Sequence, residues 1–187
     1  MIQKYRKKQF SFRFIDVPVE FTQNGLIGSV ILWIVLLVAA LLLTELTPLD
    51  AFIAGFFGVV IHWLLECTHQ YGHYLAGRSV GYPLHKMKTW WIVMMGLYPR
   101  DEPELAPAIH LRRAIGGAIL SGVVGIILLI LAAMFWRVGG MLRFWLGYAL
   151  FLDIVVMTFG AFIPIKLGNF MTDGATILHY MRLRDKA

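Results

Sequence analysis

The sequence predicts an all-α polytopic membrane protein with four transmembrane helices. Of its 187 residues, 59% are hydrophobic and only 15% are charged. The mean hydropathy of +0.71 is far above that of a soluble domain. The length suits one compact bundle, so we expect a single membrane domain over residues 1–187. The net charge of +6 does not indicate nucleic-acid binding, because the Lys and Arg residues gather at the ends of the apolar segments.

Four apolar segments are long enough to cross a bilayer. We expect these spans at residues 26–46, 51–77, 114–136 and 144–163. Five basic residues precede the first span, six lie between the second and third, and four follow the fourth, whereas the other two connections carry none and two. Because cytoplasmic loops carry the excess of Lys and Arg, this distribution predicts that both termini are cytoplasmic.

The segments outside the spans differ in composition. Residues 1–25 interleave phenylalanines with basic residues, which is typical of an anchor at the cytoplasmic membrane surface. Within the connection 78–113, the stretch from Lys86 to Tyr98 is too short to span as a helix. We expect an interfacial strand or hairpin there. Residues 164–187 hold an Asp-Gly pair, which we expect to open a short helix, and then a basic cytoplasmic tail.

The second span carries ionisable side chains in an otherwise apolar helix. From Ile61 to Gly77 it reads IHWLLECTHQYGHYLAG. At 100° per residue, four of these side chains share one stripe of the helix: His62, Glu66, His69 and His73. Ionisable groups at membrane depth face the protein interior and are functional candidates by default.

Two of these histidines have the spacing of metal ligands. His69 and His73 are separated by one helical turn, so both imidazoles can reach one metal ion. The predicted topology brings Asp173, just beyond the fourth span, to the same side of the membrane. An aspartate held there could complete a site of two histidines, one carboxylate and one open position, which is the geometry of catalytic zinc.

These motifs resemble those of a known family. HQYGHYLAG resembles the H-E-x-x-H helix of the site-2 protease family of intramembrane zinc metalloproteases, with Gln70 in place of the glutamate. TDG after a proline-terminated helix resembles that family's Asp-Gly motif. HLRRAIGGAILSG resembles the small-residue start of the helix between the two motifs. The resemblance covers roughly residues 51–180.

The resemblance implies a three-helix, metalloprotease-like core inside the membrane. It implies that His69, His73 and Asp173 bind zinc and that position 70 holds the general base. We expect such a protein to be a multi-pass protein of a bacterial or archaeal cell membrane.

The substrates that the resemblance implies are transmembrane or juxtamembrane segments of other membrane proteins. In that family an edge strand near the active site is thought to pair with the unwound substrate. The matching stretch here contains Trp90 and Trp91, which are therefore candidates for substrate binding.

The residue at position 70 determines how much activity to expect. A glutamine can donate a hydrogen bond to a water but cannot take its proton, and general acid–base catalysis contributes about 10²–10⁴-fold to rate. Three accounts stay open: a natural pseudoprotease, an introduced Glu-to-Gln substitution, or a catalytic base relocated to Glu66. If Glu66 is not the catalytic base, we expect its side chain to orient the metal-binding residues without binding the metal itself.

Two other classes of function fit parts of the pattern. A catalytically inactive scaffold would hold membrane-protein segments in the same cleft, and Gln70 would be expected in it. A b-type haem or electron-transfer bundle would pair His62 or His69 with a histidine on another span, and none is well placed for this. His62 and Asp153 fall at similar depths on the second and fourth spans, where we expect a functional pair or a buried polar link.

Overall fold

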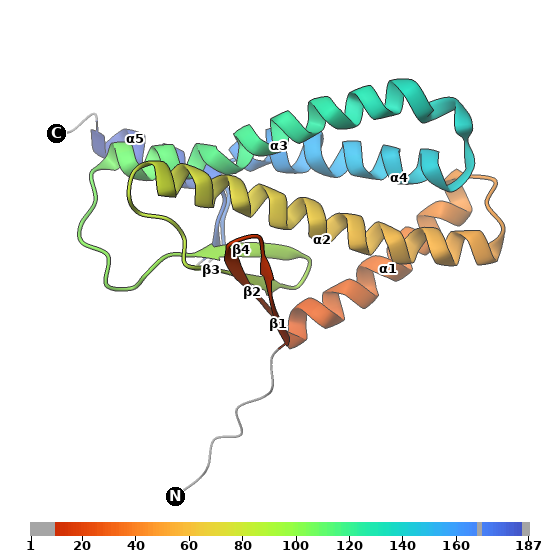
Figure 1. The fold of residues 1–187 in the computed structure, drawn as a ribbon, viewed down its shortest axis with the longest axis horizontal. Helices are drawn as coiled ribbons and strands as arrows, with labels where there is room; N and C mark the ends of the chain where they lie inside the picture. The colour runs from red at the N-terminus through yellow and green to blue at the C-terminus, as the bar shows by residue number, and fades with distance from the viewer. Residues whose placement is uncertain (1–9, 168–169, 185–187) are drawn as a thin grey trace, which may run out of the picture.

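A helical bundle and a small sheet make up the protein (Figure 1). The computed structural model describes residues 10–167 and 170–184. Within these residues, four helices are long and apolar enough to cross a membrane, as the sequence predicts. Five of the basic residues used to assign the topology lie outside the described residues: Lys4, Arg6, Lys7, Lys8 and Lys186.

The helices follow the expected order with shifted ends. The first two are α1 (Gln23–Leu43) and α2 (Pro48–Ser79). The third is α3 (Pro107–Phe135), extended by η1 (Trp136–Val138). The fourth span combines α4 (Gly140–Leu150), a π-helical segment η2 (Phe151–Phe159) and η3 (Gly160–Phe162). Two short strands, β5 (Lys166–Leu167) and β6 (Phe170–Met171), lead to α5 (Asp173–Arg184).

Local signals fix the starts of three helices. The Thr22 side chain caps α1 by accepting a hydrogen bond from the backbone N–H of Gly25, and Thr47 caps α2 through the N–H of Asp50. A proline in the first turn, Pro48 in α2 and Pro107 in α3, has no N–H to leave unpaired there. This start places the first turns of α3 in residues that the sequence assigned to a loop.

Four strands form one mixed sheet. The strands are β1 (Phe10–Phe14), β2 (Val17–Phe21), β3 (Lys86–Trp90) and β4 (Val93–Leu97). They lie in the order β1-β2-β3-β4, in which two antiparallel hairpins join through a parallel β2–β3 pair. The β3–β4 hairpin agrees with the strand or hairpin expected between the second and third spans. The β1–β2 hairpin was not predicted, because the alternating phenylalanines of residues 10–14 were interpreted as a membrane anchor.

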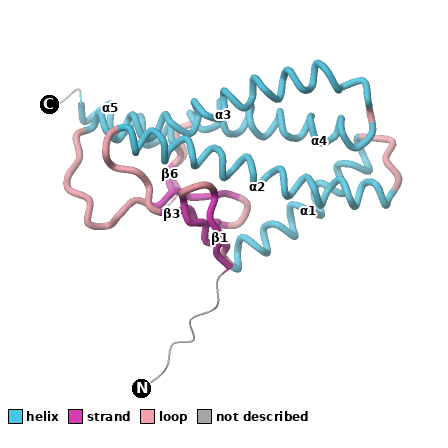
Figure 2. Tube along the Cα trace, viewed as in Figure 1, coloured by secondary structure: helices cyan, strands magenta, loops and turns pink. Residues whose placement is uncertain are grey.

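The sheet packs on α2. Figure 2 shows the strands together alongside this helix. A buried apolar cluster joins Cys67 of α2 to Val19, Met87 and Met94 of the sheet. The start of α1 is tied to the same sheet, because the Thr22 hydroxyl donates to the Thr89 carbonyl at 2.9 Å. These contacts fix β4 against the helix that carries the histidines.

α3 completes the surroundings of the site. It packs against α2, η2 and α5. Gly72 of α2 and Gly116 of α3 are close enough that a Cβ on either would overlap the backbone of the other. Such small residues let two membrane helices approach closely. The result is that the C-terminal half of α2, the start of α3 and the start of α5 meet (Figure 1).

Candidate metal centre

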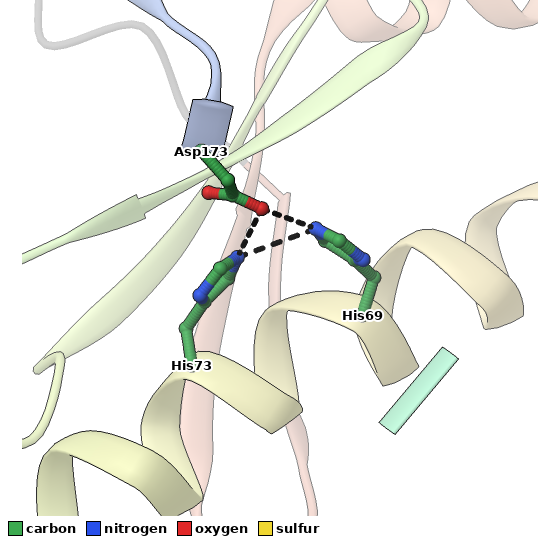
Figure 3. A group of neighbouring side chains, drawn as sticks. All are labelled: His69, His73 and Asp173. Carbon is green, nitrogen blue, oxygen red and sulfur yellow. Dashed lines mark hydrogen bonds and ion pairs between the residues drawn. The ribbon is translucent and has the colours of Figure 1, made fainter. Parts of the chain in front are cut away.

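Two helices bring the three predicted ligands together. His69 and His73 lie one turn apart on α2, and Asp173 is the first residue of α5 (Figure 3). Both histidines are buried, whereas the Asp173 side chain keeps 19% of its surface exposed. All three groups turn toward one point between the helices.

The spacing of the three ligand atoms fits a tetrahedral metal ion. The Nε2 atoms of His69 and His73 lie 3.2 Å apart, and each lies 3.3 Å from Oδ2 of Asp173. Ligand atoms about 2.0–2.1 Å from a tetrahedral zinc stand about 3.3–3.4 Å from one another. The three atoms therefore form a triangle of the size of one face of such a site.

Contacts with α3 orient both imidazoles. Nδ1 of His69 lies 3.0 Å from the hydroxyl of Ser121, and Nδ1 of His73 lies 2.8 Å from the carbonyl oxygen of Arg113. When each Nδ1–H donates to these oxygens, each Nε2 presents a lone pair toward the other histidine and Asp173. Metal-binding histidines typically donate their second ring nitrogen to such a partner.

The charge of Asp173 suits a cation. Burial alone would raise the pKa of this carboxyl, but when His73 and His69 are protonated, their charge and their N–H donors hold its pKa well below its ordinary value. A metal cation bound by the neutral imidazoles would act in the same direction. The carboxylate anion is therefore the form that faces the two imidazoles. Two imidazole nitrogens and one carboxylate oxygen are ligands that zinc commonly takes in proteins.

A cavity of about 570 Å³ lies next to the three groups. Its walls come from α2, β4, α3, η2 and the start of α5. The β4 side of the lining runs from Val93 to Tyr98. On the α3 side, Arg113 lies over the Tyr98 ring at 3.2 Å and donates to Glu102 at 3.0 Å.

A solved structure has a similar arrangement of elements. This structure is a site-2 protease from Methanocaldococcus jannaschii, at a TM-score of 0.58 and 19% sequence identity, over 95% of this chain and 73% of that chain. The chain has the site-2 protease fold. No family model matches the sequence, and no curated protein matches it. The fold-level likeness supports the resemblance that the motifs indicate.

Within this site-2 protease fold, the side chains of Gln70 and Glu66 contact strand β4. Nε2 of Gln70 donates to the carbonyl oxygen of Met94 at 2.9 Å. Oε2 of Glu66 accepts from the backbone N–H of the same residue at 2.8 Å. Both side chains also line the cavity. Their catalytic roles stay predictions.

The other polar residues noted in the sequence lie elsewhere. Trp90 and Trp91 are at the tip of the β3–β4 hairpin, more than a third exposed, and their role in substrate binding stays a prediction. His62 does not pair with Asp153. Its ring nitrogens lie 2.9 Å from the Tyr148 hydroxyl and 2.6 Å from the Ile92 carbonyl oxygen. The Asp153 carboxylate has no hydrogen-bond partner among the described residues.

Two residues of the site were missed in the sequence. The sequence indicates Ser121 only as one of the small residues that let helices pack, and Arg113 only as a basic residue of a cytoplasmic loop. A usable signal exists for Ser121, since a hydroxyl within a glycine-rich stretch of a membrane helix needs a hydrogen-bond partner. The role of Arg113 depends on its backbone carbonyl, which no side-chain pattern reveals.

Proposed function

We propose that this protein is a member of the site-2 protease family that binds one zinc ion through His69, His73 and Asp173. The observation that carries the proposal is the 3.2–3.3 Å triangle of ligand atoms at the junction of α2 and α5. The site-2 protease fold supports it. Zinc bound there would polarise a peptide carbonyl and lower the pKa of a water molecule.

The substrates that we propose are transmembrane or juxtamembrane segments of other membrane proteins. The cavity beside the ligands has a peptide-like wall, the strand β4 from Val93 to Leu97. Both outward backbone groups of Met94 are taken by Gln70 and Glu66, so we propose that an extended chain adds to the edge of this strand beyond Met94, through main-chain hydrogen bonds. In this proposal the protein is one membrane domain in the lipid bilayer, with both termini and the ligands toward the cytoplasm.

Hydrolysis by this site is proposed to be weak or absent. A side-chain amide at position 70 cannot accept a proton, and the amide of Gln70 is engaged with Met94. General base catalysis, about 10²–10⁴-fold in rate, is therefore missing from this position. The catalytically inactive scaffold is the second candidate function. It is favoured by the hydrogen bonds that direct both Gln70 and Glu66 to Met94.

The zinc content of the purified protein tests the proposed site. We expect about one zinc ion per chain in the wild type, and a loss of zinc in both His69→Ala and Asp173→Ala. A matched control is His179→Ala, since His179 is an exposed histidine on α5. Its zinc content should equal that of the wild type.

Two results would contradict the proposal. Wild-type protein without zinc, after purification with zinc present, would leave a scaffold as the function that fits the fold. Zinc that persists in Asp173→Ala would mean that the carboxylate is not a ligand. Cleavage of a single-span test protein by the wild type then distinguishes a slow protease from a scaffold.

A further inference from the structure

The outer edge of β4 is covered by side chains of α2. Strand β4 is the last strand of the sheet, so its second edge has no neighbouring strand within residues 10–167 and 170–184. Three residues of α2 one turn apart lie along this edge: His62, Glu66 and Gln70. We call these three residues the α2 ladder. They contact, in order, the carbonyl of Ile92, the N–H of Met94 and the carbonyl of Met94.

The register of the hairpin shows why Met94 needs these partners. Trp90 pairs with Val93 across a two-residue turn, and Thr89 pairs with Met94. In an antiparallel ladder, alternate residues direct their N–H and C=O toward the partner strand and away from it. Since the pair that closes a two-residue turn is hydrogen-bonded, the backbone groups of Met94 point away from β3.

The depth of this strand edge in the membrane disfavours backbone N–H and C=O groups that have no hydrogen-bond partner. His62 lies about 21 Å along the axis of α2 from Pro48, at a rise of 1.5 Å per residue. The predicted topology puts the start of α2 at the outer membrane surface. Because the hydrocarbon core of a bilayer is about 30 Å thick, we infer that His62 and the hairpin tip beside it lie at membrane depth. A backbone N–H or C=O group without a hydrogen-bond partner is strongly disfavoured there, because no water can replace the partner. The α2 ladder supplies partners that water would supply at a soluble edge.

We propose that Glu66 and Gln70 are positioning residues that hold β4 in place by pairing with both backbone polar groups of Met94. The Glu66 carboxyl oxygen accepts at 2.8 Å and the Gln70 amide donates at 2.9 Å to Met94. Together they replace the peptide group that a fifth strand would supply. Both contacts are buried. Gln70 also fits closely against the next residue of the edge, since a Cβ on Gly96 would lie 2.8 Å from its Oε1.

This role explains the residue type at position 70. The Met94 carbonyl requires a donor, which glutamine has and an ionised glutamate lacks. A glutamate at position 70 would direct a carboxylate oxygen at a carbonyl oxygen, so it would leave the strand. The inference goes beyond the proposed function, because the contacts with Met94 exist whether or not the site binds zinc.

The methionines of the chain allow a direct test. Met94 and Met95 are adjacent among nine methionines, so selective ¹⁵N-methionine labelling yields a small set of amide signals. The Met94 N–H faces Glu66, whereas by the same alternation the Met95 N–H faces β3. Full-length protein in nanodiscs would be compared by amide hydrogen exchange as the wild type, Glu66→Leu and Glu66→Gln.

We expect Glu66→Leu to speed exchange of the Met94 amide by about tenfold or more, because the acceptor is lost. Glu66→Gln keeps an acceptor oxygen and should restore the rate to within about threefold of the wild type. A Met94 rate that is the same in the wild type and Glu66→Leu would overturn the role of Glu66. Equal acceleration in Glu66→Leu and Glu66→Gln would overturn it too.

The ¹⁵N chemical shift of Met95 tests the role of Gln70 separately. It also tests the proposal if Glu66→Leu does not fold. The Met94 carbonyl and the Met95 nitrogen belong to one peptide group, so the ¹⁵N shift of Met95 responds to a hydrogen bond at that carbonyl. We expect this signal to move in both Gln70→Leu and the isosteric Gln70→Glu, while the Met134 signal from the far end of α3 stays in place. An unchanged Met95 signal in both variants would overturn the proposal for Gln70.

Discussion

The carbonyl oxygen of Met94 accepts a hydrogen bond of 2.9 Å from the side-chain amide of Gln70. This contact connects the position of the expected general base to the strand that lines the cavity. The amide is buried and engaged. A carboxylate at the same position would find no donor at that carbonyl, so it would be available for proton transfer.

Gln70→Glu is therefore expected to raise proteolysis. A restored general base contributes about 10²–10⁴-fold, and even partial recovery gives about a tenfold increase in cleavage of a single-span test substrate. The measurement is the amount of product formed by purified protein and substrate in the same nanodiscs. The reference is Gln70→Glu combined with His69→Ala, which removes a proposed ligand. Equal cleavage by these two proteins would refute a latent catalytic site.

Ser121→Ala is expected to weaken zinc binding. The Ser121 hydroxyl lies 3.0 Å from Nδ1 of His69 and is fully buried, so alanine leaves that nitrogen without a partner. Loss of such a contact lowers metal affinity by about 10–100-fold. Competition with a chelator of known zinc affinity measures the zinc affinity of each protein. Ser79→Ala is the control, because the Ser79 hydroxyl is exposed and donates to the backbone carbonyl of Ala76, away from the ligands. Equal affinities of Ser121→Ala and wild type would contradict the orienting role.

The helical part of the fold was predictable because membrane helices leave a strong signal. Uninterrupted apolar segments, with basic residues at their ends, predicted the number and order of the four long apolar helices, although α3 begins seven residues before the predicted span. The β1–β2 hairpin left a weaker signal, since five-residue strands have little periodicity to detect. Its pairing with β3 joins residues near 19 and 87, and a contact at that separation has no local signature.

The candidate ligands were predictable for a different reason. His69 and His73 belong to one helix, so their separation fixes their geometry, and topology alone brought Asp173 to the same side. The contacts of Glu66 and Gln70 with Met94 were not predictable, because they depend on how β4 lies against α2. The sequence predicts Glu66 on the histidine stripe, whereas the structure directs its carboxyl group to the backbone N–H of Met94.

Glu20→Gln is expected to loosen the sheet in a pH-dependent manner. The hydrogen bond from Lys86, 2.6 Å away, lowers the pKa of Glu20 below its ordinary value of 4.5, with burial opposing and Lys88 assisting. A lowered folded-state pKa means that the stabilisation is complete above pH 4.5 and is lost as the pH falls through the folded-state value.

The size of this effect is modest. At neutral pH we expect Glu20→Gln to lower the free energy of unfolding by about 1 kcal/mol, and the difference from the wild type should shrink as the pH falls below about 4. Thermal unfolding in detergent across this pH range measures it. Glu104→Gln, at an exposed loop position, should match the wild type throughout. A difference that persists unchanged at low pH would exclude the ion pair as its cause.

Gly117→Ala is expected to abolish the metal site while leaving the fold intact. A Cβ on Gly117 would overlap Nε2 of His73 and lie 2.7 Å from Nε2 of His69, so a methyl group would enter the space between the ligands. We expect the zinc content to fall at least about tenfold, because ligands displaced by about an ångström no longer meet the distances of the site.

The matched control lies on the same helix. A Cβ on Gly122 would meet only a methyl group of Thr158 at 3.9 Å, so Gly122→Ala adds the same methyl group without touching a ligand. Zinc per chain should stay at the wild-type level in this variant, and both variants should unfold near the wild-type temperature. Full zinc content in Gly117→Ala would show that the ion is not held between these two histidines, because the added methyl group and a bound metal compete for the same space.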